Sequence, residues 1–89
     1  MTPLPLGAIY ATPGALRLLD RAGVSPTTLL ARHARGDWGD IPPEDAAENR
    51  LSIEQGFRVL SNYRLDDDRI WIITEADRTS TTLLLPEEY

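Results

Sequence analysis

Two short stretches near the N-terminus place apolar residues every three or four positions, which is the spacing of an amphipathic helix. The first begins at Thr12, a favoured N-cap residue that precedes proline, and ends at Gly23. The second begins in the same way at Ser25 and ends at Gly36. Helices joined by so few residues predict an αα-hairpin. The side chains expected to face the core are Ala15, Leu16, Leu18, Leu19 and Ala22 in the first helix, and Leu29, Leu30 and His33 in the second.

A third helix is predicted over residues 43–55, after a loop at residues 37–43 that is rich in proline, glycine and aspartate. Glu44 and Asp45 fall in its first turn, where the helix dipole favours acidic side chains. Its apolar residues are few, so we expect one narrow buried stripe. That stripe consists of Ala46, Ala47, Leu51 and Ile53.

The remainder of the chain has the β-branched and aromatic composition of strands, interrupted by polar turns at residues 66–68 and 76–80. The predicted strands are residues 6–11, 57–63, 69–74 and 81–85. Successive hairpins predict a C-terminal antiparallel meander. The predicted fold class is therefore α+β, with three short helices packed on a three- or four-stranded antiparallel sheet. We expect a single domain spanning residues 1–89.

Residues 69–74 are apolar on both faces of the predicted strand, which is the pattern of a central strand covered on both sides. The helices provide one of the two covers. For the second face we expect either the N-terminal segment or a partner protein.

Charge and composition exclude several classes of protein. The chain has 14 acidic and 9 basic residues, a formal net charge of −5, which argues against direct nucleic-acid binding through clustered basic side chains. It has no cysteine, which excludes disulfides, thiolate metal ligands and a thiol nucleophile. No apolar run approaches the roughly 18 residues of a membrane span, and the first residues lack the pattern of a signal peptide. All 9 basic residues are arginine, a bias of GC-rich coding DNA, and we expect a cytoplasmic bacterial protein.

His33 is the only histidine and the only candidate general base. Asp37 or Asp40 would have to orient it, and no serine lies in the Gly-x-Ser-x-Gly turn that exposes a nucleophile. A histidine near a helix C-terminus is also explained by its interaction with the helix dipole. The acids of residues 37–45 do not have the spacing of the twelve-residue calcium loop. We therefore predict no catalytic residue, no metal site and no cofactor.

The loop before the third helix is the strongest candidate for an interface. Trp38 lies there as either an anchor that pins the loop to the core or an exposed contact for a partner. The first hairpin turn adds a second acidic segment. The candidate binding residues are Asp37, Trp38, Asp40, Glu44, Asp45, Asp66, Asp67 and Asp68. In the second hairpin turn, we expect Arg78 to form a local network with Glu75 and Asp77.

Two stretches resemble a family of small bacterial proteins of plasmids and integrative elements, known as plasmid-related proteins: residues 30–40 (LARHARGDWGD), followed by an acidic helix start, and residues 71–89 (WIITEADRTSTTLLLPEEY). The resemblance covers nearly the whole chain. It implies a mobile genetic element as the genomic setting. It implies no particular activity and no catalytic residues.

We therefore expect a non-enzymatic protein-binding module encoded on a mobile genetic element. In one version it is an acidic inhibitor of a nucleic-acid-binding host defence protein, such as a restriction nuclease or a CRISPR complex, because complementary charge speeds and orients docking. Three alternatives stay open. They are a small enzyme or ligand-binding protein centred on His33, a toxin–antitoxin component, and a self-associating protein whose apolar strands pair at an edge as a homodimer.

Overall fold

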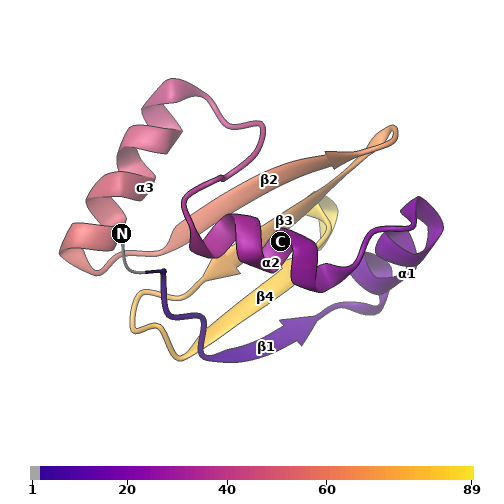
Figure 1. Cartoon of the computed structure of the whole chain (residues 1–89), viewed down its shortest axis with the longest axis horizontal. Coiled ribbons are helices and arrows are strands. Elements are labelled where there is room, and N and C mark those ends of the chain that lie inside the picture. The colour runs from indigo at the N-terminus through magenta and orange to yellow at the C-terminus, as the bar shows by residue number, and fades with distance from the viewer. Residues whose placement is uncertain (1–2) are drawn as a thin grey trace.

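A four-stranded sheet forms the centre of the molecule, with helices along one face and at both ends (Figure 1). The computed structural model describes residues 3–89. The prediction that the first residues are not a signal peptide falls partly on Met1 and Thr2, which lie outside the described residues. In chain order the elements are β1 (Ala8–Ala11), α1 (Pro13–Ala22), α2 (Pro26–Ala34), α3 (Pro43–Gln55), β2 (Val59–Leu65), β3 (Asp68–Thr74), β4 (Ser80–Leu84) and the 3-10 turn η1 (Pro86–Glu88). The α+β class and the three helices are as predicted. None of the helices within residues 3–89 combines the length and apolar character needed to cross a membrane.

The sheet is mixed, which corrects the prediction of a purely antiparallel one. Its strand order is β1-β4-β3-β2, and β2, β3 and β4 form the expected antiparallel meander. β1 pairs with β4 in parallel, with Ile9 opposite Thr81. Three helices separate β1 from β2 along the chain, so no tight hairpin turn fixes its direction.

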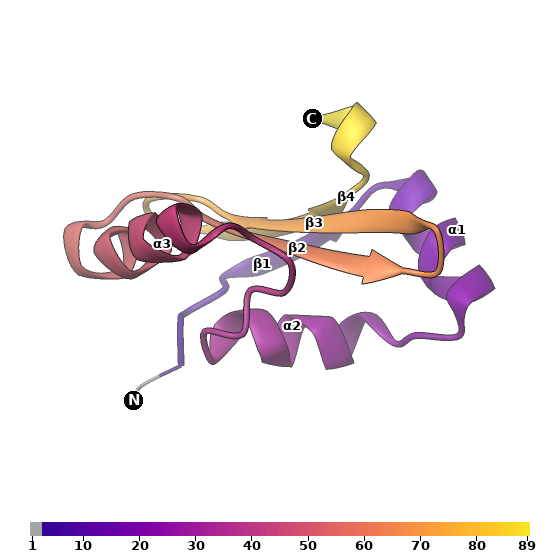
Figure 2. The same ribbon diagram turned by 90° about the horizontal axis from the view of Figure 1, so that it is seen from above.

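One face of the sheet packs against α2, while α1 closes one end of the sheet (Figure 2). Because α1 lies at the end and α2 along the face, the two helices do not form the expected αα-hairpin. Leu16 of α1 is exposed and was wrongly assigned to the core, whereas Leu29 and His33 of α2 are buried as expected. The main apolar cluster consists of Ala15, Leu18, Leu19, Leu29, Tyr63, Leu65, Ile70, Ile72 and Leu83.

The opposite face is covered only in part, by the C-terminal end of the chain (Figure 2). Tyr89 makes an edge-to-face contact with Trp71 of β3, with ring centroids 5.6 Å apart. The N-terminal segment is not this second cover. The amide of Leu4 donates to the carbonyl of Ala34 at 2.9 Å, and Leu4 is buried against Trp38, which holds the segment on the α2 side.

α3 contacts the sheet mainly through polar side chains, which corrects the predicted apolar stripe. Its buried residues are Asn49 and Ser52. Of the predicted stripe, Ala46 is half-buried against a cluster of Leu4, Trp38 and Val59, as expected, whereas Ala47, Leu51 and Ile53 are exposed. The Asn49 amide donates to the Leu60 carbonyl at 2.7 Å and accepts from the Leu60 amide at 3.1 Å. A side chain thereby forms the pair of hydrogen bonds that a neighbouring strand would otherwise make with β2.

The loop between α2 and α3 hydrogen-bonds to the next outward-facing residue of β2, which is Asn62. The Asn62 amide donates to the Trp38 carbonyl at 3.0 Å, and the Asn62 carbonyl accepts from the Asp40 amide at 2.7 Å. Gly39 permits this approach, since its φ is +76° and a Cβ atom there would lie 2.2 Å from the Asn62 carbonyl oxygen. Two successive outward-facing positions of β2 are therefore already paired within the chain.

Replacement of Asn49 by alanine tests how much this edge contact stabilises the fold. Asn49→Ala leaves the Leu60 amide and carbonyl without partners, and we expect the free energy of unfolding to fall by about 1–3 kcal/mol. Chemical denaturation measures the loss, with Arg50→Ala on the exposed side of α3 as the control, which should change stability by less than about 0.5 kcal/mol. Equal losses in both variants would show that Asn49 has no special role at the edge.

Candidate functional site

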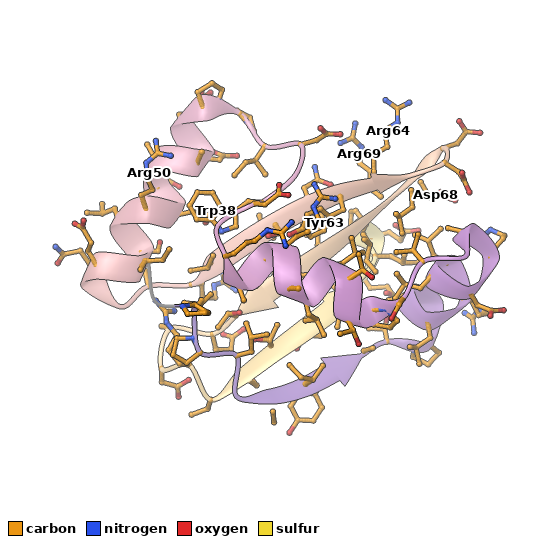
Figure 3. All side chains as sticks on the ribbon, viewed as in Figure 1. Trp38, Arg50, Tyr63, Arg64, Asp68 and Arg69 are labelled. Atoms are coloured by element: carbon orange, nitrogen blue, oxygen red, sulfur yellow. The ribbon has the colours of Figure 1, made fainter. Side chains whose placement is uncertain are left out.

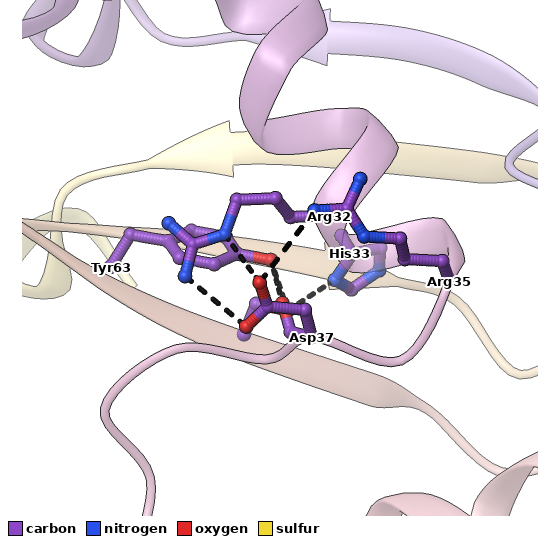
Figure 4. A network of polar contacts seen from close by, with 6 residues as sticks. Arg32, His33, Arg35, Asp37 and Tyr63 are labelled. Atoms are coloured by element: carbon purple, nitrogen blue, oxygen red, sulfur yellow. Dashed lines mark hydrogen bonds and ion pairs between the residues drawn. The ribbon is translucent and has the colours of Figure 1, made fainter.

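Trp38 is an anchor of the α2–α3 loop. Its side chain is only 8% exposed and packs with Leu4 and Val59 in a second apolar cluster. The same loop carries Asp37, whose carboxylate accepts two hydrogen bonds from Arg32, at 2.7 and 3.1 Å (Figure 4). These bonds lower the pKa of Asp37, and Arg35 adds a longer ion pair at 3.9 Å. The Trp38 ring is therefore buried within the chain itself, and the Asp37 carboxylate is already ion-paired.

The structure does not gather the predicted acidic residues into one surface. Asp66 and Asp67 form the exposed tip of the β2–β3 hairpin, and Asp68 is paired with Arg21 at 3.0 Å. Arg64 and Arg69, which face each other across β2 and β3, lie between this tip and the position where the α2–α3 loop docks (Figure 3). The acids on the other side of this arginine pair are Asp40, Glu44 and Asp45, all exposed.

His33 lies in a buried chain of hydroxyl groups. Its side chain is 0% exposed, with Nδ1 2.5 Å from Ser61 Oγ and Nε2 2.8 Å from Thr74 Oγ1. Thr74 Oγ1 in turn lies 2.7 Å from Thr81 Oγ1, and Thr81 donates to the Leu6 carbonyl at 2.7 Å. The chain links α2 to three strands and to the N-terminal segment.

The Leu6 carbonyl, where this series of hydrogen bonds ends, fixes the direction of each bond in the series. A carbonyl only accepts, so Thr81 donates to Leu6, Thr74 donates to Thr81, and His33 donates from Nε2 to Thr74. His33 Nδ1 is then the acceptor of the Ser61 hydroxyl. The network assigns a neutral imidazole with its proton on Nε2. Burial lowers the pKa of His33 to about 4, which keeps this form at neutral pH.

Tyr63 joins the same network to the α2–α3 loop. Its hydroxyl donates to the Asp37 carbonyl at 2.6 Å and lies 3.1 Å from Ser61 Oγ, and burial raises the pKa of Tyr63 to about 12. The guanidinium of Arg32 lies over the Tyr63 ring, 4.6 Å from its centroid. His33 thus has no contact with the Asp37 carboxylate that was considered as its orienting group, because Arg32 occupies that carboxylate (Figure 4).

A groove on the partly covered face of the sheet joins apolar and charged side chains. Leu60, Trp71 and Ile73 line it from the sheet, and Tyr89 lines it from the C-terminus. Asp45 and Glu48, one turn apart on α3, line the other side, and the volume is about 310 Å³. Neither acid forms an ion pair within residues 3–89. The remaining lining residues are Ile41, Asn49, Ser52 and Arg58, whose guanidinium lies over the Tyr89 ring.

Sequence reasoning found only Asp45 among the groove residues. The sequence leaves Trp38 as either a buried anchor or an exposed contact, names it among the binding residues, and gives Trp71 no binding role. In the structure Trp38 is the buried anchor, and Trp71 is half-buried in the groove wall. A usable signal was present: Trp71 alternates with Ile70 and Ile72, so it faces away from the side of the sheet that α2 covers.

The expected network of Arg78 with two acids is also wrong. Arg78 donates to the carbonyls of Ser52, Phe57 and Glu75 at 2.9, 2.7 and 3.1 Å. The Asp77 carboxylate instead accepts from the amide and hydroxyl of Thr79. Arg78 therefore places a positive charge at the C-terminal end of α3, where the helix dipole favours it, and fixes the end of that helix relative to the β3–β4 turn.

Comparison of the chain with protein-family models, with curated proteins and with solved structures finds no match.

The burial of neutral His33 predicts a specific pH dependence of stability. The unfolded chain takes up a proton on His33 as the pH falls through about 6.5, whereas the folded protein does so only near its pKa of about 4. The free energy of unfolding should therefore fall by about 1.4 kcal/mol per pH unit from pH 6 towards pH 4, and His33 should add no further loss at lower pH.

Denaturant titrations at pH 7, 6 and 5 measure this slope before most carboxylates titrate. His33→Gln keeps a hydrogen-bond donor and acceptor but does not titrate, so its slope over this interval should be close to zero. If the variant keeps the slope of the parent protein, another group is responsible for it.

Proposed function

We propose that the protein is a non-enzymatic protein-binding module and that the groove between α3, the sheet and Tyr89 is its binding site. The observation that carries the proposal is the combination of an aromatic and aliphatic floor with two acids, Asp45 and Glu48, that form no ion pair within residues 3–89. Apolar floors with a charged rim are the usual composition of a protein-binding hot spot.

The chemistry of the groove favours a segment that combines an apolar side chain with an arginine or lysine. The apolar side chain would pack on Trp71 and Ile73, which the partly covered face of the sheet leaves accessible. The cation would be attracted by Asp45 and Glu48 on the opposite wall. An apolar side chain alone, or a basic side chain alone, would not distinguish such a segment from other surface peptides.

The state of His33 supports a binding module over an enzyme centred on that residue. Its ring is 0% exposed and both nitrogens are within hydrogen-bond distance of buried hydroxyls. A general base has to reach a substrate, directly or through one water. Ser61, the hydroxyl next to His33, is also 0% exposed.

We further propose that the partner is a host protein with a basic surface, and that the module acts in the bacterial cytoplasm as an inhibitor encoded on a mobile element. The net charge of −5 supports this version, because it favours docking onto proteins that bind nucleic acid. The resemblance to plasmid-related proteins supports the mobile element as the source.

Selection of binders from a displayed random-peptide library tests the proposed site. We expect enriched peptides to pair an arginine or lysine with a large apolar residue one or two positions away. The double variant Asp45→Arg/Glu48→Arg should weaken a selected peptide by at least about tenfold, which is about 1.4 kcal/mol, and should reduce the salt dependence of binding. Tyr89→Ala should weaken the same peptide without changing that salt dependence.

Two control variants separate the groove from general acidity. Asp20→Arg changes an exposed charge on α1, outside the groove, and should leave binding unchanged. Asp66→Asn/Asp67→Asn removes charge at the hairpin tip, where the sequence also predicted binding, and should have a small effect. A larger loss at the hairpin tip than at Asp45 and Glu48 would move the site to the hairpin. Equal binding by all variants would contradict a site in the groove.

A further inference from the structure

The two edges of the sheet are treated very differently by the chain. Asn49 and the α2–α3 loop hydrogen-bond to the outer edge of β2, which is how folded proteins protect a strand edge from other chains. β1 forms the opposite edge, and within residues 3–89 no element lies beyond it (Figure 1). β1 has the sequence AIYA, without a charged residue or a proline, and Ile9 and Tyr10 are 46% and 59% exposed.

The hydrogen bonds of β1 show which of its backbone groups remain free. The amides of Ala8 and Thr12 donate to carbonyls on the β4 side, each at 3.0 Å. Backbone groups of alternate residues point in opposite directions along a strand, so the amides and carbonyls of Ile9 and Ala11 face outward. This short edge therefore presents two donors and two acceptors, placed symmetrically about Tyr10.

We propose that β1 pairs antiparallel with β1 of a second copy, around a two-fold axis at Tyr10. In this register Ile9 lies opposite Ala11 of the second copy, and the two pairs exchange four hydrogen bonds. Tyr10 faces its own counterpart across a non-hydrogen-bonded position, where the Cα atoms are about 4.5 Å apart and side chains are closest. Every free backbone group of Ile9 and Ala11 is then paired.

Neighbouring residues restrict the pairing to this register. Gly7 has a φ of +66°, outside the extended region, so the strand begins only at Ala8. At the other end, Pro13 begins α1. With the two-fold axis at Ile9, Ala11 would lie opposite Gly7 of the second copy. With the axis at Ala11, Ile9 would lie opposite Pro13. Either shift loses two of the four hydrogen bonds.

The charge distribution favours a second copy at this edge. The unpaired acids of the groove and the α2–α3 loop, Asp40, Asp45 and Glu48, lie with α3 and the outer side of β2, on the far side of the sheet (Figure 1). Arg32 of α2 is turned towards Tyr63 of β2. Leu30 of α2 and Ala11 of β1 both pack on the main apolar cluster. Two copies can therefore approach along β1 without bringing these three acids together, and the carboxylate beside the end of β1, that of Glu88, is already hydrogen-bonded to Thr12 and Leu85.

The mass of the protein in solution tests the proposal. We expect sedimentation equilibrium to give twice the chain mass of 9.9 kDa, with a monomer–dimer equilibrium that shifts with concentration. Tyr10→Glu places two like charges opposite each other at the axis and should give a monomer. Thr82→Glu is the matched control, since Thr82 is the neighbour of Tyr10 within the sheet but one strand further from the axis, and it should remain dimeric.

Mixing and cross-linking distinguish this pairing from any other dimer. Tyr10→Glu mixed with Tyr10→Lys should restore the dimeric mass, because the opposing charges are then complementary. The parent chain has no cysteine, so Tyr10→Cys should form a disulfide-linked dimer on oxidation, whereas Ile9→Cys should not, since Ile9 lies opposite Ala11.

A monomer at millimolar concentration would overturn the proposal, as would a dimer that survives Tyr10→Glu or one that cross-links equally well through Ile9→Cys. The groove variants Asp45→Arg/Glu48→Arg should not change the mass, so the outcome is independent of the proposed peptide-binding function.

Discussion

The buried imidazole of His33 is the constraint on which the arrangement of the other elements depends. A neutral histidine with no access to water requires a partner for each nitrogen, and those partners are Ser61 on β2 and Thr74 on β3. Thr74 extends the chain to Thr81 on β4, and Thr81 needs the Leu6 carbonyl as its acceptor. Satisfied buried networks are stable only as a whole, so this one fixes α2, the meander and the N-terminal segment together.

The position of α2 in turn determines how the outer edge of β2 is closed. Tyr63 holds the Asp37 carbonyl, which directs the α2–α3 loop along the strand and places Gly39 against Asn62. α3 then lies where Asn49 reaches Leu60, and Arg78 secures the other end of that helix. Polar contacts, together with the packing of Ala46 on the cluster of Leu4, Trp38 and Val59, position α3. These contacts hold α3 beside the sheet although Leu51 and Ile53 are exposed, and they leave a groove between the helix and the sheet.

The features that the sequence predicted correctly are those decided by local chemistry. Thr12 and Ser25 cap their helices through side-chain hydrogen bonds, and Gly23 and Gly56 end helices with φ values of +69° and +77°. The meander also follows from neighbouring segments. Most of the errors involve partners distant in the chain; the predicted αα-hairpin of the neighbouring helices α1 and α2 is an exception. Nothing near β1 specifies that it pairs in parallel with β4, and nothing near Asn49 indicates that a polar residue is buried there to complete a strand edge.

The candidate site shows the same limit. From the sequence, a tryptophan in a glycine-flanked loop is a better candidate for a binding residue than one in an apolar strand. The exposure of each tryptophan, however, depends on which face of the sheet is covered. Leu4, which comes from the N-terminal segment, covers Trp38, whereas Trp71 contacts the Tyr89 ring and stays half-buried. The periodicity of β3 identified a strand with two apolar faces, but it does not say that the second face is left partly open beside two acids.

Placing the proposed pairing at β1 and the proposed groove beside α3 has a consequence for binding. The four strands separate the two sites, so a two-fold pair would form a continuous sheet of eight strands with one groove near each end. Such a pair would bind a partner carrying two suitably spaced basic–apolar segments far more tightly than a single segment, because the second contact becomes intramolecular. The gain depends on whether the spacing of the partner's segments matches that of the grooves. A dimer-breaking change at Tyr10 should therefore weaken binding of a two-segment partner while leaving the affinity for a single peptide unchanged. That difference separates the contribution of the β1 edge from that of the groove.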